Sequence, residues 1–255
     1  MIGTGRKTAL ITGAARRIGK HLAIELASQG ITVAVHHNGS EDEAAEVVDS
    51  IKTAGGNAFA VQADLSSEKE TNNLIAETTK ILDEPIGILI NNASVFQQDT
   101  LSTLTASSWD LHHNVNLRAP VLLTQAFAKQ LPRSEQGIVI NMIDQRVFKL
   151  NPQYMSYTAS KAGLLAVTKT MAQALAPNGI RVNGIGPGPT LANEHQSAED
   201  FASEAACVPL GSGPSLDEIA ACVRFILETP SLTGQMIALD GGQHLAWRTK
   251  DILED

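Results

Sequence analysis

The sequence predicts an α/β fold in which helices flank a doubly wound sheet of seven parallel strands. Short apolar runs alternate with amphipathic stretches along all 255 residues. Strands that alternate with helices pair in parallel, because each helix returns the chain to the edge of the sheet where the previous strand began. No linker, repeat or low-complexity stretch divides the chain. Residues 1–255 are therefore predicted to form one domain.

Hydrophobic periodicity places the individual elements. The apolar runs that predict strands cover residues 8–12, 32–36, 58–62, 86–91, 137–142, 181–186 and 235–239. The patterns that predict helices cover residues 18–29, 41–54, 68–81, 107–131, 156–176 and 216–227. Capping boxes are predicted where a serine is followed three residues later by a glutamate, at Ser40, Ser67 and Ser215.

One segment, residues 187–214, does not fit this alternation. It is long, weakly periodic and rich in Gly, Pro, Ser and Ala. Segments of this length in compact domains are usually functional or mobile, which favours a lid over a binding site. An irregular surface excursion with a short helix is the alternative.

Composition excludes several classes of protein. Hydrophobic residues make up 43% and charged residues 18%, as in ordinary globular proteins, and the net charge of −8 argues against nucleic-acid binding. No stretch approaches the roughly 20 apolar residues of a membrane span. The two cysteines cannot build a disulfide framework, which fits a cytoplasmic protein. The seven histidines lack metal-ligand spacing, so no metal site is expected.

A glycine-rich turn follows the first predicted strand and precedes the first helix. It reads Thr12-Gly-Ala-Ala-Arg-Arg-Ile-Gly19. Glycines at such a turn let the backbone approach a phosphate, and the helix that follows offers free N–H groups and the positive end of its dipole. The position of the turn on the first strand–helix connection predicts a dinucleotide site of the Rossmann type.

With this turn the chain resembles the short-chain dehydrogenase/reductase family, whose motif is T-G-x-x-x-G-x-G. Gly13 and Gly19 match the motif, and Arg17 stands at the middle glycine. The second strand ends in V-H-H-N-G-S without an acidic residue before Glu41, so nothing there repels a 2′-phosphate. Arg16, Arg17 and Ser40 are expected to form a phosphate pocket, which favours NADP(H), and Ser40 can also act as a helix cap.

Further positions match the family's cofactor contacts. Asp64 ends the third strand, where the family contacts adenine, and Asn92-Ala93-Ser94 stands where the family usually has N-A-G. Pro187-Gly188 resembles the turn beside the nicotinamide. The positions that the resemblance assigns to cofactor binding are Gly13, Arg16, Arg17, Ile18, Gly19, His36, Ser40, Asp64, Leu65, Asn92, Ala93, Ser94, Lys161, Pro187 and Gly188.

The predicted catalytic pair is Tyr157 and Lys161, a Y-x-x-x-K motif. Residues four apart lie on one face of a helix. An unperturbed phenol has a pKa of about 10, and the nearby ammonium is expected to lower it, so that Tyr157 can serve as a proton donor. Tyr154 has the wrong spacing to Lys161. The family's catalytic asparagine is matched by Asn116 in V-N-L.

A catalytic serine normally precedes the family's tyrosine by 13 residues, but this chain has Asp144 there. A carboxylate would repel a carbonyl oxygen and would instead bind N–H groups or relay protons. Asp144 capping a turn is the alternative. Arg17, Ser94, Phe96 and Asp144 together look like the pteridine reductase and dihydromonapterin reductase branch of the family. The segments 193–195 and 239–245 agree with that branch.

The resemblance implies a pterin substrate held by Arg17, Ser94, Phe96, Asp144 and Tyr157. Phe96 would stack on the flat ring, or it is an aromatic residue of the core or the rim. The expected function is NADPH-dependent reduction of a dihydropterin, with Tyr157 as proton donor. The alternatives are an NADPH-dependent ketone or aldehyde reductase and a non-catalytic NADPH-sensing protein. Relatives are usually homotetramers, and the same state is expected here.

Overall fold

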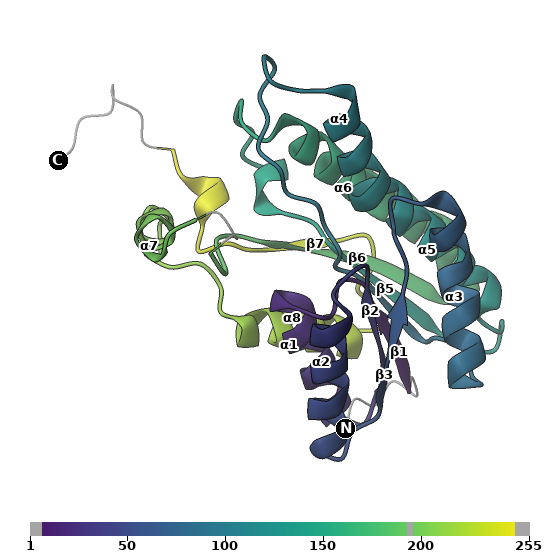
Figure 1. The fold of residues 1–255 in the computed structure, drawn as a ribbon. Helices are drawn as coiled ribbons and strands as arrows, with labels where there is room; N and C mark the ends of the chain where they lie inside the picture. Colours follow the sequence, from purple (N-terminus) through teal and green to yellow (C-terminus); the bar gives the residue numbers. More distant parts are fainter. Residues whose placement is uncertain (1–6, 193–195, 248–255) are drawn as a thin grey trace.

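The computed structural model describes residues 7–192 and 196–247 (Figure 1). Its centre is a seven-stranded, all-parallel sheet in the order β3-β2-β1-β4-β5-β6-β7, which confirms the predicted fold class. The strands are β1 (Thr8–Ile11), β2 (Thr32–His37), β3 (Ala58–Gln62), β4 (Ile88–Asn91), β5 (Gly137–Met142), β6 (Ile180–Pro187) and β7 (Met236–Leu239). The α-helices are α1 (Arg17–Ser28), α2 (Glu41–Thr53), α3 (Glu68–Leu82), α4 (Ala106–His113), α5 (Ala119–Gln130), α6 (Met155–Leu175), α7 (Ala198–Ala206) and α8 (Leu216–Glu228).

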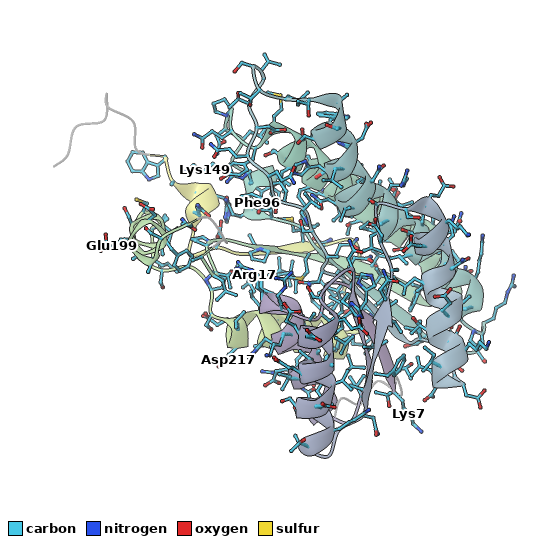
Figure 2. All side chains as sticks on the ribbon, in the orientation of Figure 1. Lys7, Arg17, Phe96, Lys149, Glu199 and Asp217 are labelled. Atoms are coloured by element: carbon cyan, nitrogen blue, oxygen red, sulfur yellow. The ribbon has the colours of Figure 1, made fainter. Side chains whose placement is uncertain are left out.

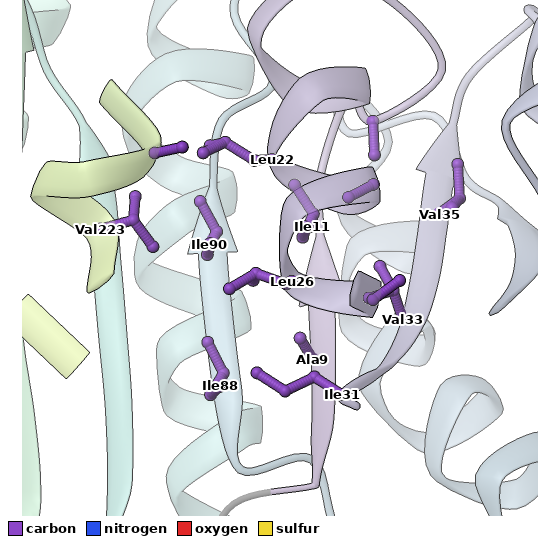
Figure 3. Packing of buried hydrophobic residues seen from close by; sticks show 14 of the residues in the cluster. Ala9, Ile11, Leu22, Leu26, Ile31, Val33, Val35, Ile88, Ile90 and Val223 are labelled. Atoms are coloured by element: carbon purple, nitrogen blue, oxygen red, sulfur yellow. The ribbon is translucent and has the colours of Figure 1, made fainter. Parts of the chain in front are cut away.

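Helices cover both faces of this sheet (Figure 1). On one face, Leu22 and Leu26 of α1 and Val223 of α8 belong to the same buried cluster as Ile11 and Ile90 of the sheet (Figure 3). On the other face, side chains from α3, α5 and α6 form a second buried cluster with the sheet. Because both faces are covered, the central strands β1, β4 and β5 are buried along their whole length rather than alternating.

The strand order places the site. The chain builds β1, β2 and β3 outward, then returns to place β4 on the other side of β1. Such a reversal opens a crevice at the carboxyl ends of the two central strands, where ligands bind in doubly wound folds. The glycine-rich turn leaves β1 at this crevice, and the segment 92–96 leaves β4 beside it.

The predicted helix 107–131 is wrong in one respect, because a π-helical turn, η1 (Asn114–Arg118), separates α4 from α5. Pro120 stands in the first turn of α5. Proline has no N–H to donate to the carbonyl four residues back, and its ring crowds that carbonyl, which belongs to Asn116. The wider turn relieves this conflict, and such turns are frequent at functional sites.

The predicted capping boxes need correction. Ser215 and Glu218 form the predicted box. Ser67 accepts from the Glu70 N–H, but the Glu70 carboxylate accepts from the Asp64 N–H and so does not complete a box, and Ser40 makes no capping hydrogen bond with its side chain. The segment 187–214 contains a short helix, α7, which lies outside the two helical layers (Figure 1). Residues 193–195, which supported the narrower resemblance, lie outside the described residues.

Neither a membrane-spanning helix nor a cluster of metal ligands is present in the described parts of the chain. No helix between residues 7 and 192 or between 196 and 247 is long and apolar enough to cross a bilayer. Within the same ranges, no three His, Cys, Asp or Glu side chains gather as metal ligands.

Candidate active site

The glycine-rich turn is held in shape by hydrogen bonds from two other strands. The Asn92 side chain donates to the carbonyl oxygens of Thr12 (2.8 Å) and Gly13 (3.1 Å). The Thr12 hydroxyl oxygen accepts from the N–H groups of Asn92 (2.9 Å) and Ala93 (3.0 Å). A Cβ at Gly19 would overlap the carbonyl oxygen of Gly13, so only glycine fits there. These hydrogen bonds hold the turn against the segment that follows β4.

The turn fits a dinucleotide diphosphate. Its glycines leave a cradle that side chains would fill, and Gly13 adopts the left-handed φ of +62°. The amino end of α1 has no side-chain cap and no acidic residue in its first turn. Its first N–H groups and the positive end of its dipole can therefore serve an anion.

His36 supports this turn rather than facing a ligand with its ring. The imidazole is buried, its Nδ1 accepts from the Gly13 N–H (3.0 Å), and its Nε2 lies 3.1 Å from the Ala63 carbonyl oxygen. This pattern needs the neutral tautomer with hydrogen on Nε2. Burial lowers the pKa of His36 to about 4. The sequence predicted that His36 contacts the cofactor. Both ring nitrogens are already engaged with the protein, so the imidazole has no nitrogen left for such a contact.

Acidification is expected to destabilise the fold through His36. Between pH 6.5 and 4 the unfolded chain binds a proton on this imidazole that the folded chain excludes, so stability is lost as the pH falls. A shift of the pKa from 6.5 to about 4 corresponds to about 3 kcal/mol over the whole window. Urea unfolding at pH 7 and pH 5 should show a smaller loss for His36→Gln than for the wild type. An equal loss in both proteins would contradict this role.

The two arginines of the turn have different partners. Arg16 lies 3.9 Å from the Glu43 carboxylate at the start of α2, on the β2 side of the turn. The Arg17 guanidinium donates to the carbonyl oxygens of Ala192 (2.6 Å) and Leu191 (3.2 Å), which follow β6. The sequence suggested one phosphate pocket formed by Arg16, Arg17 and Ser40, whereas here the Arg16 side chain lies towards α2 and that of Arg17 lies towards the segment after β6. Figure 2 shows Arg17 and Phe96 at the same end of the sheet.

Other residues that the sequence predicted to bind the cofactor lie on α1, after β3 and at the end of β6. Leu65 is buried in the cluster on one face of the sheet, and the partly buried Ile18 packs against the cluster on the other face. The Asp64 carboxylate accepts from the Ser66 N–H (2.8 Å), which closes the turn after β3. The Gly188 N–H donates to the Leu239 carbonyl oxygen (2.8 Å), and this bond joins the Pro187-Gly188 turn to β7. A Cβ at Gly188 would crowd Asp240.

Asn116 is fully buried in the π-helical turn and joins three segments. Its Nδ2 donates to the Val95 carbonyl oxygen (2.9 Å) and to the Ser160 hydroxyl (3.2 Å). Its Oδ1 accepts from the Val95 N–H (2.8 Å) and the Ser94 hydroxyl (3.2 Å). Asn116 thus ties the segment after β4 to the helix α6 that carries Tyr157.

Tyr157 and Asp144 form a direct pair. The Tyr157 hydroxyl donates to Asp144 Oδ2 at 2.8 Å, and Asp144 Oδ1 accepts from the Arg146 N–H at 2.7 Å. Burial raises the pKa of Asp144, against the hydrogen bonds that favour its charged form. Burial and then the charge of Asp144 raise the pKa of Tyr157 well above its usual value. The phenol therefore keeps its proton at neutral pH.

The sequence suggested that Lys161 lowers the pKa of Tyr157, but the pKa of Tyr157 is raised. Its Nζ donates to the Met142 carbonyl oxygen at 2.8 Å and lies 5.6 Å from the centre of the Tyr157 ring. Burial lowers the pKa of Lys161 to about 8. Tyr157 and Lys161 both lie in α6, and burial and the charge of Asp144 raise the pKa of the tyrosine.

An aromatic stack lies beside this pair. The rings of Phe96 and Tyr154 are parallel at 4.3 Å, and Phe96 meets Tyr157 edge-on at 4.7 Å. The Arg146 guanidinium lies 5.0 Å from the centre of the Tyr154 ring. Phe96 keeps 41% of its surface exposed, so it can receive a second flat ring. Tyr154, set aside because of its spacing to Lys161, is thus part of the site.

Sequence reasoning missed several supporting residues. Thr12 was identified as the first residue of the glycine-rich turn, but the support that its hydroxyl gives to Asn92 and Ala93 was not. His112 is fully buried, and its Nε2 accepts from the Gln97 N–H at 3.1 Å. Asp99 is buried beside Ser156 at the start of α6. The contacts of His112 and Asp99 are made across the fold, so no local motif marks them.

Comparisons with known proteins agree with this geometry. Residues 7–202 match the family model of the short chain dehydrogenases. The structure is similar to FolM alternative dihydrofolate reductase 1 from Brucella canis, complexed with NADP: TM-score 0.94, 48% identity, 99% of this chain and 100% of that chain covered. The same protein from Brucella suis, also in complex with NADP, gives a TM-score of 0.92 and 50% identity, with 96% and 98% covered.

A relative of different named activity is the 3-oxoacyl-[acyl-carrier-protein] reductase FabG of Staphylococcus epidermidis. It is 32% identical over 243 residues, which cover 94% of this chain and 99% of the relative. The family model covers most of the chain, and these relatives match it almost from end to end. The chain therefore belongs to the short-chain dehydrogenase/reductase family.

Proposed function

We propose that the protein reduces a C=N bond of a dihydropterin with NADPH, and that Tyr157 donates the proton. The observation that carries this proposal is the 2.8 Å hydrogen bond from the Tyr157 hydroxyl to Asp144, beside the exposed ring of Phe96. A carboxylate at this place suits a substrate with N–H donors, which pterins have. Two relatives are named alternative dihydrofolate reductases, and dihydrofolate contains a dihydropterin ring.

NADP(H) is the cofactor of this reductase. The glycine cradle and the uncapped amino end of α1 fit its diphosphate, and both FolM structures contain NADP. Ser40 stands where β2 leads into α2, and the Arg16 side chain lies near Glu43 in the first turn of α2, so both are assigned to the 2′-phosphate. Asp64 is assigned to the adenine, and the Pro187-Gly188 turn to the nicotinamide. When bound, NADPH supplies the hydride.

The protein's own groups supply the proton. The Tyr157 O–H bond breaks as a bond forms between its hydrogen and the substrate nitrogen, while the neighbouring carbon receives the hydride. The raised pKa of Tyr157 holds the proton on the phenol until that moment. A proton from solvent then restores the phenol, and Asp144 is well placed to relay it, because it contacts the same oxygen. One hydride and one proton saturate one C=N bond.

The remaining groups position the substrate. The Phe96 ring is assigned to one face of the pterin, and Tyr154 supports it from behind. Asp144 and Ser94 are assigned to the polar edge of the ring. Arg17 binds the carbonyl oxygens of residues 191 and 192 and so links the glycine turn to the segment 187–214. We infer that this segment acts as a lid over the substrate.

Arg16 is expected to set the preference for NADPH. Arg16→Ala should raise the KM for NADPH about fivefold to tenfold and leave the KM for NADH unchanged, because only NADPH carries a phosphate for the guanidinium. The matched variant Glu43→Gln removes the carboxylate that pairs with Arg16 and should lower the KM for NADPH. Steady-state rates with both cofactors measure this. An unchanged KM for NADPH in Arg16→Ala would place the phosphate elsewhere.

Ketone reduction is the second candidate, because the FabG relative is a 3-oxoacyl reductase. Asp144 argues against it, since an ionised carboxylate in place of a hydroxyl repels a carbonyl oxygen. A sensor without catalysis is the third candidate. The hydrogen-bonded Tyr157 and the buried Asn116 and Lys161 argue against that reading, because they form the arrangement that catalysis requires.

A substrate panel separates these three functions. NADPH oxidation should be followed with 7,8-dihydrofolate and 7,8-dihydrobiopterin, with an acetoacetyl thioester, and with ketones and quinones. We expect turnover with dihydropterins. Turnover with carbonyl compounds alone would overturn the pterin assignment. Tight NADPH binding without turnover of any compound would support the sensor instead.

Two further expectations rest on the family resemblance. We expect a homotetramer in the cytoplasm, with no membrane or nucleic-acid partner. Sedimentation velocity of the purified protein at micromolar concentration tests the assembly, and a monomer would contradict it.

A further inference from the structure

Asp99 is a buried acid that the mechanism above does not use. It lies in the segment between β4 and α4 and exposes only 3% of its surface. Its carboxylate oxygens accept from the Ser156 N–H at 3.2 and 3.3 Å and also from the Ser156 hydroxyl. Its main-chain carbonyl oxygen accepts from the Tyr154 N–H at 2.8 Å. One residue thus contacts both neighbours of Met155, where α6 begins.

Helix α6 lacks a cap of its own. Tyr154 occupies the capping position in the left-handed conformation (φ 55°, ψ 48°), its side chain makes no capping bond, and the first turn contains no acidic residue. The first N–H groups of a helix need acceptors, and a negative charge there interacts favourably with the dipole. Asp99 provides both from a distant part of the chain.

The two tyrosines of the protein lie on either side of Ser156. Tyr157 follows it and donates to Asp144, while Tyr154 precedes it and stacks on Phe96. Phe96 stands three residues before Asp99 in the same segment. The Asp99–Ser156 contact therefore joins the segment that carries the stacking ring to the helix that carries the proton donor.

We propose that Asp99 is a positioning residue that sets the Tyr157 hydroxyl against Asp144 and the Tyr154 ring against Phe96. It touches neither the substrate nor the cofactor and acts through the start of α6. The segment around it has a second anchor, the bond from the Gln97 N–H to His112. Loss of the Asp99 carboxylate should therefore change the position of α6 relative to the segment that contains Asp99. The bond from Gln97 to His112 should still hold that segment in place. This inference requires Tyr157 to be the proton donor, but it does not require a pterin.

Activity measurements provide the first test. Asp99→Ala should lower kcat about 10- to 100-fold, because small misplacements of catalytic groups carry costs of that size. The Kd for NADPH should stay unchanged. Asp99→Asn should recover most of kcat, since its amide oxygen can still accept from Ser156. The substrate is whichever compound of the panel the wild type turns over.

The matched control is Thr105→Ala. Thr105 caps α4, and its hydroxyl accepts from the Ser108 N–H at 3.2 Å. Loss of this hydroxyl should lower the free energy of unfolding by the amount expected for a helix cap and should leave kcat unchanged. A kcat within twofold of the wild type in Asp99→Ala, with a fall in Tm like that of Thr105→Ala, would reduce Asp99 to a helix cap. So would an Asp99→Asn enzyme no faster than Asp99→Ala.

A second readout needs no turnover. The chain has two tyrosines, so labelling the hydroxyl-bearing ring carbon with carbon-13 gives two NMR signals, which Tyr154→Phe assigns. Asp99→Ala should move both signals, because it displaces both rings, whereas Thr105→Ala should move neither. Unmoved signals in Asp99→Ala would overturn the inference. Failure of the pterin proposal would leave this result intact, so the two failures are distinguishable.

Discussion

Replacing Tyr157 by Phe is expected to lower kcat by about 10²- to 10⁴-fold, the range for loss of a positioned general acid. The phenylalanine ring fills the same space and keeps the edge contact with Phe96, so the change is confined to the hydroxyl and its hydrogen bond to Asp144. The Kd for NADPH should change little, because the diphosphate is assigned to the turn after β1. Steady-state rates and a fluorescence titration with NADPH measure the two quantities.

The other tyrosine is the control. Tyr154→Phe keeps the ring that stacks on Phe96 and removes a hydroxyl that no step uses, so its kcat should stay near that of the wild type. If Tyr157→Phe kept more than a tenth of the wild-type kcat, Tyr157 would not be the donor. If Tyr154→Phe lost as much as Tyr157→Phe, the two tyrosines would have been assigned the wrong roles.

Asp144→Ser is expected to change which substrate the enzyme accepts. It removes the carboxylate that we assign to the pterin N–H groups, and a charged hydrogen bond of this kind contributes about 1.5–3 kcal/mol. The kcat/KM for dihydropterins should therefore fall at least tenfold. Reduction of quinones or ketones should rise, because a hydroxyl can donate to a carbonyl oxygen and a carboxylate cannot.

The variant Asp144→Asn separates charge from shape. It keeps the size of the side chain and an oxygen that can accept from Tyr157, but it carries no charge. Since the charge of Asp144 helps to raise the pKa of Tyr157, both substitutions should lower that pKa and move the alkaline limb of the kcat profile to lower pH. Unchanged dihydropterin kinetics in both variants would remove Asp144 from the substrate site.

The fold was predictable because its signals are local. Apolar runs in β1, β4 and β5 correspond to strands that are buried along their whole length. The interruption between α4 and α5 was missed, although Pro120 marks it, because the periodicity continues through the π-helical turn. Ser40 shows that capping spacing alone does not make a cap.

Family motifs that run along the chain supplied the candidates Tyr157, Lys161 and Asp144, and the structure places Tyr157 against Asp144 and in the same helix as Lys161. What the sequence could not supply are contacts between distant segments. The left-handed Tyr154, the buried Asp99 and the inward-facing His36 owe their surroundings to such contacts. Protonation states were missed for the same reason, because the pKa of Tyr157 depends on burial and on Asp144 rather than on its distance in sequence from Lys161.

The transfer of deuterium tests the central claim most directly. NADPH with deuterium at both C4 positions of its nicotinamide would be incubated with the wild-type protein and a 7,8-dihydropterin, and the product analysed by mass spectrometry and NMR. We expect a tetrahydropterin with one deuterium on the carbon of the former C=N bond, formed by the wild type and formed at least about 100-fold more slowly by Tyr157→Phe. Oxidation of NADPH with no deuterium in the pterin, while a 3-oxoacyl thioester or ketone gains it at the alcohol carbon, would contradict the account.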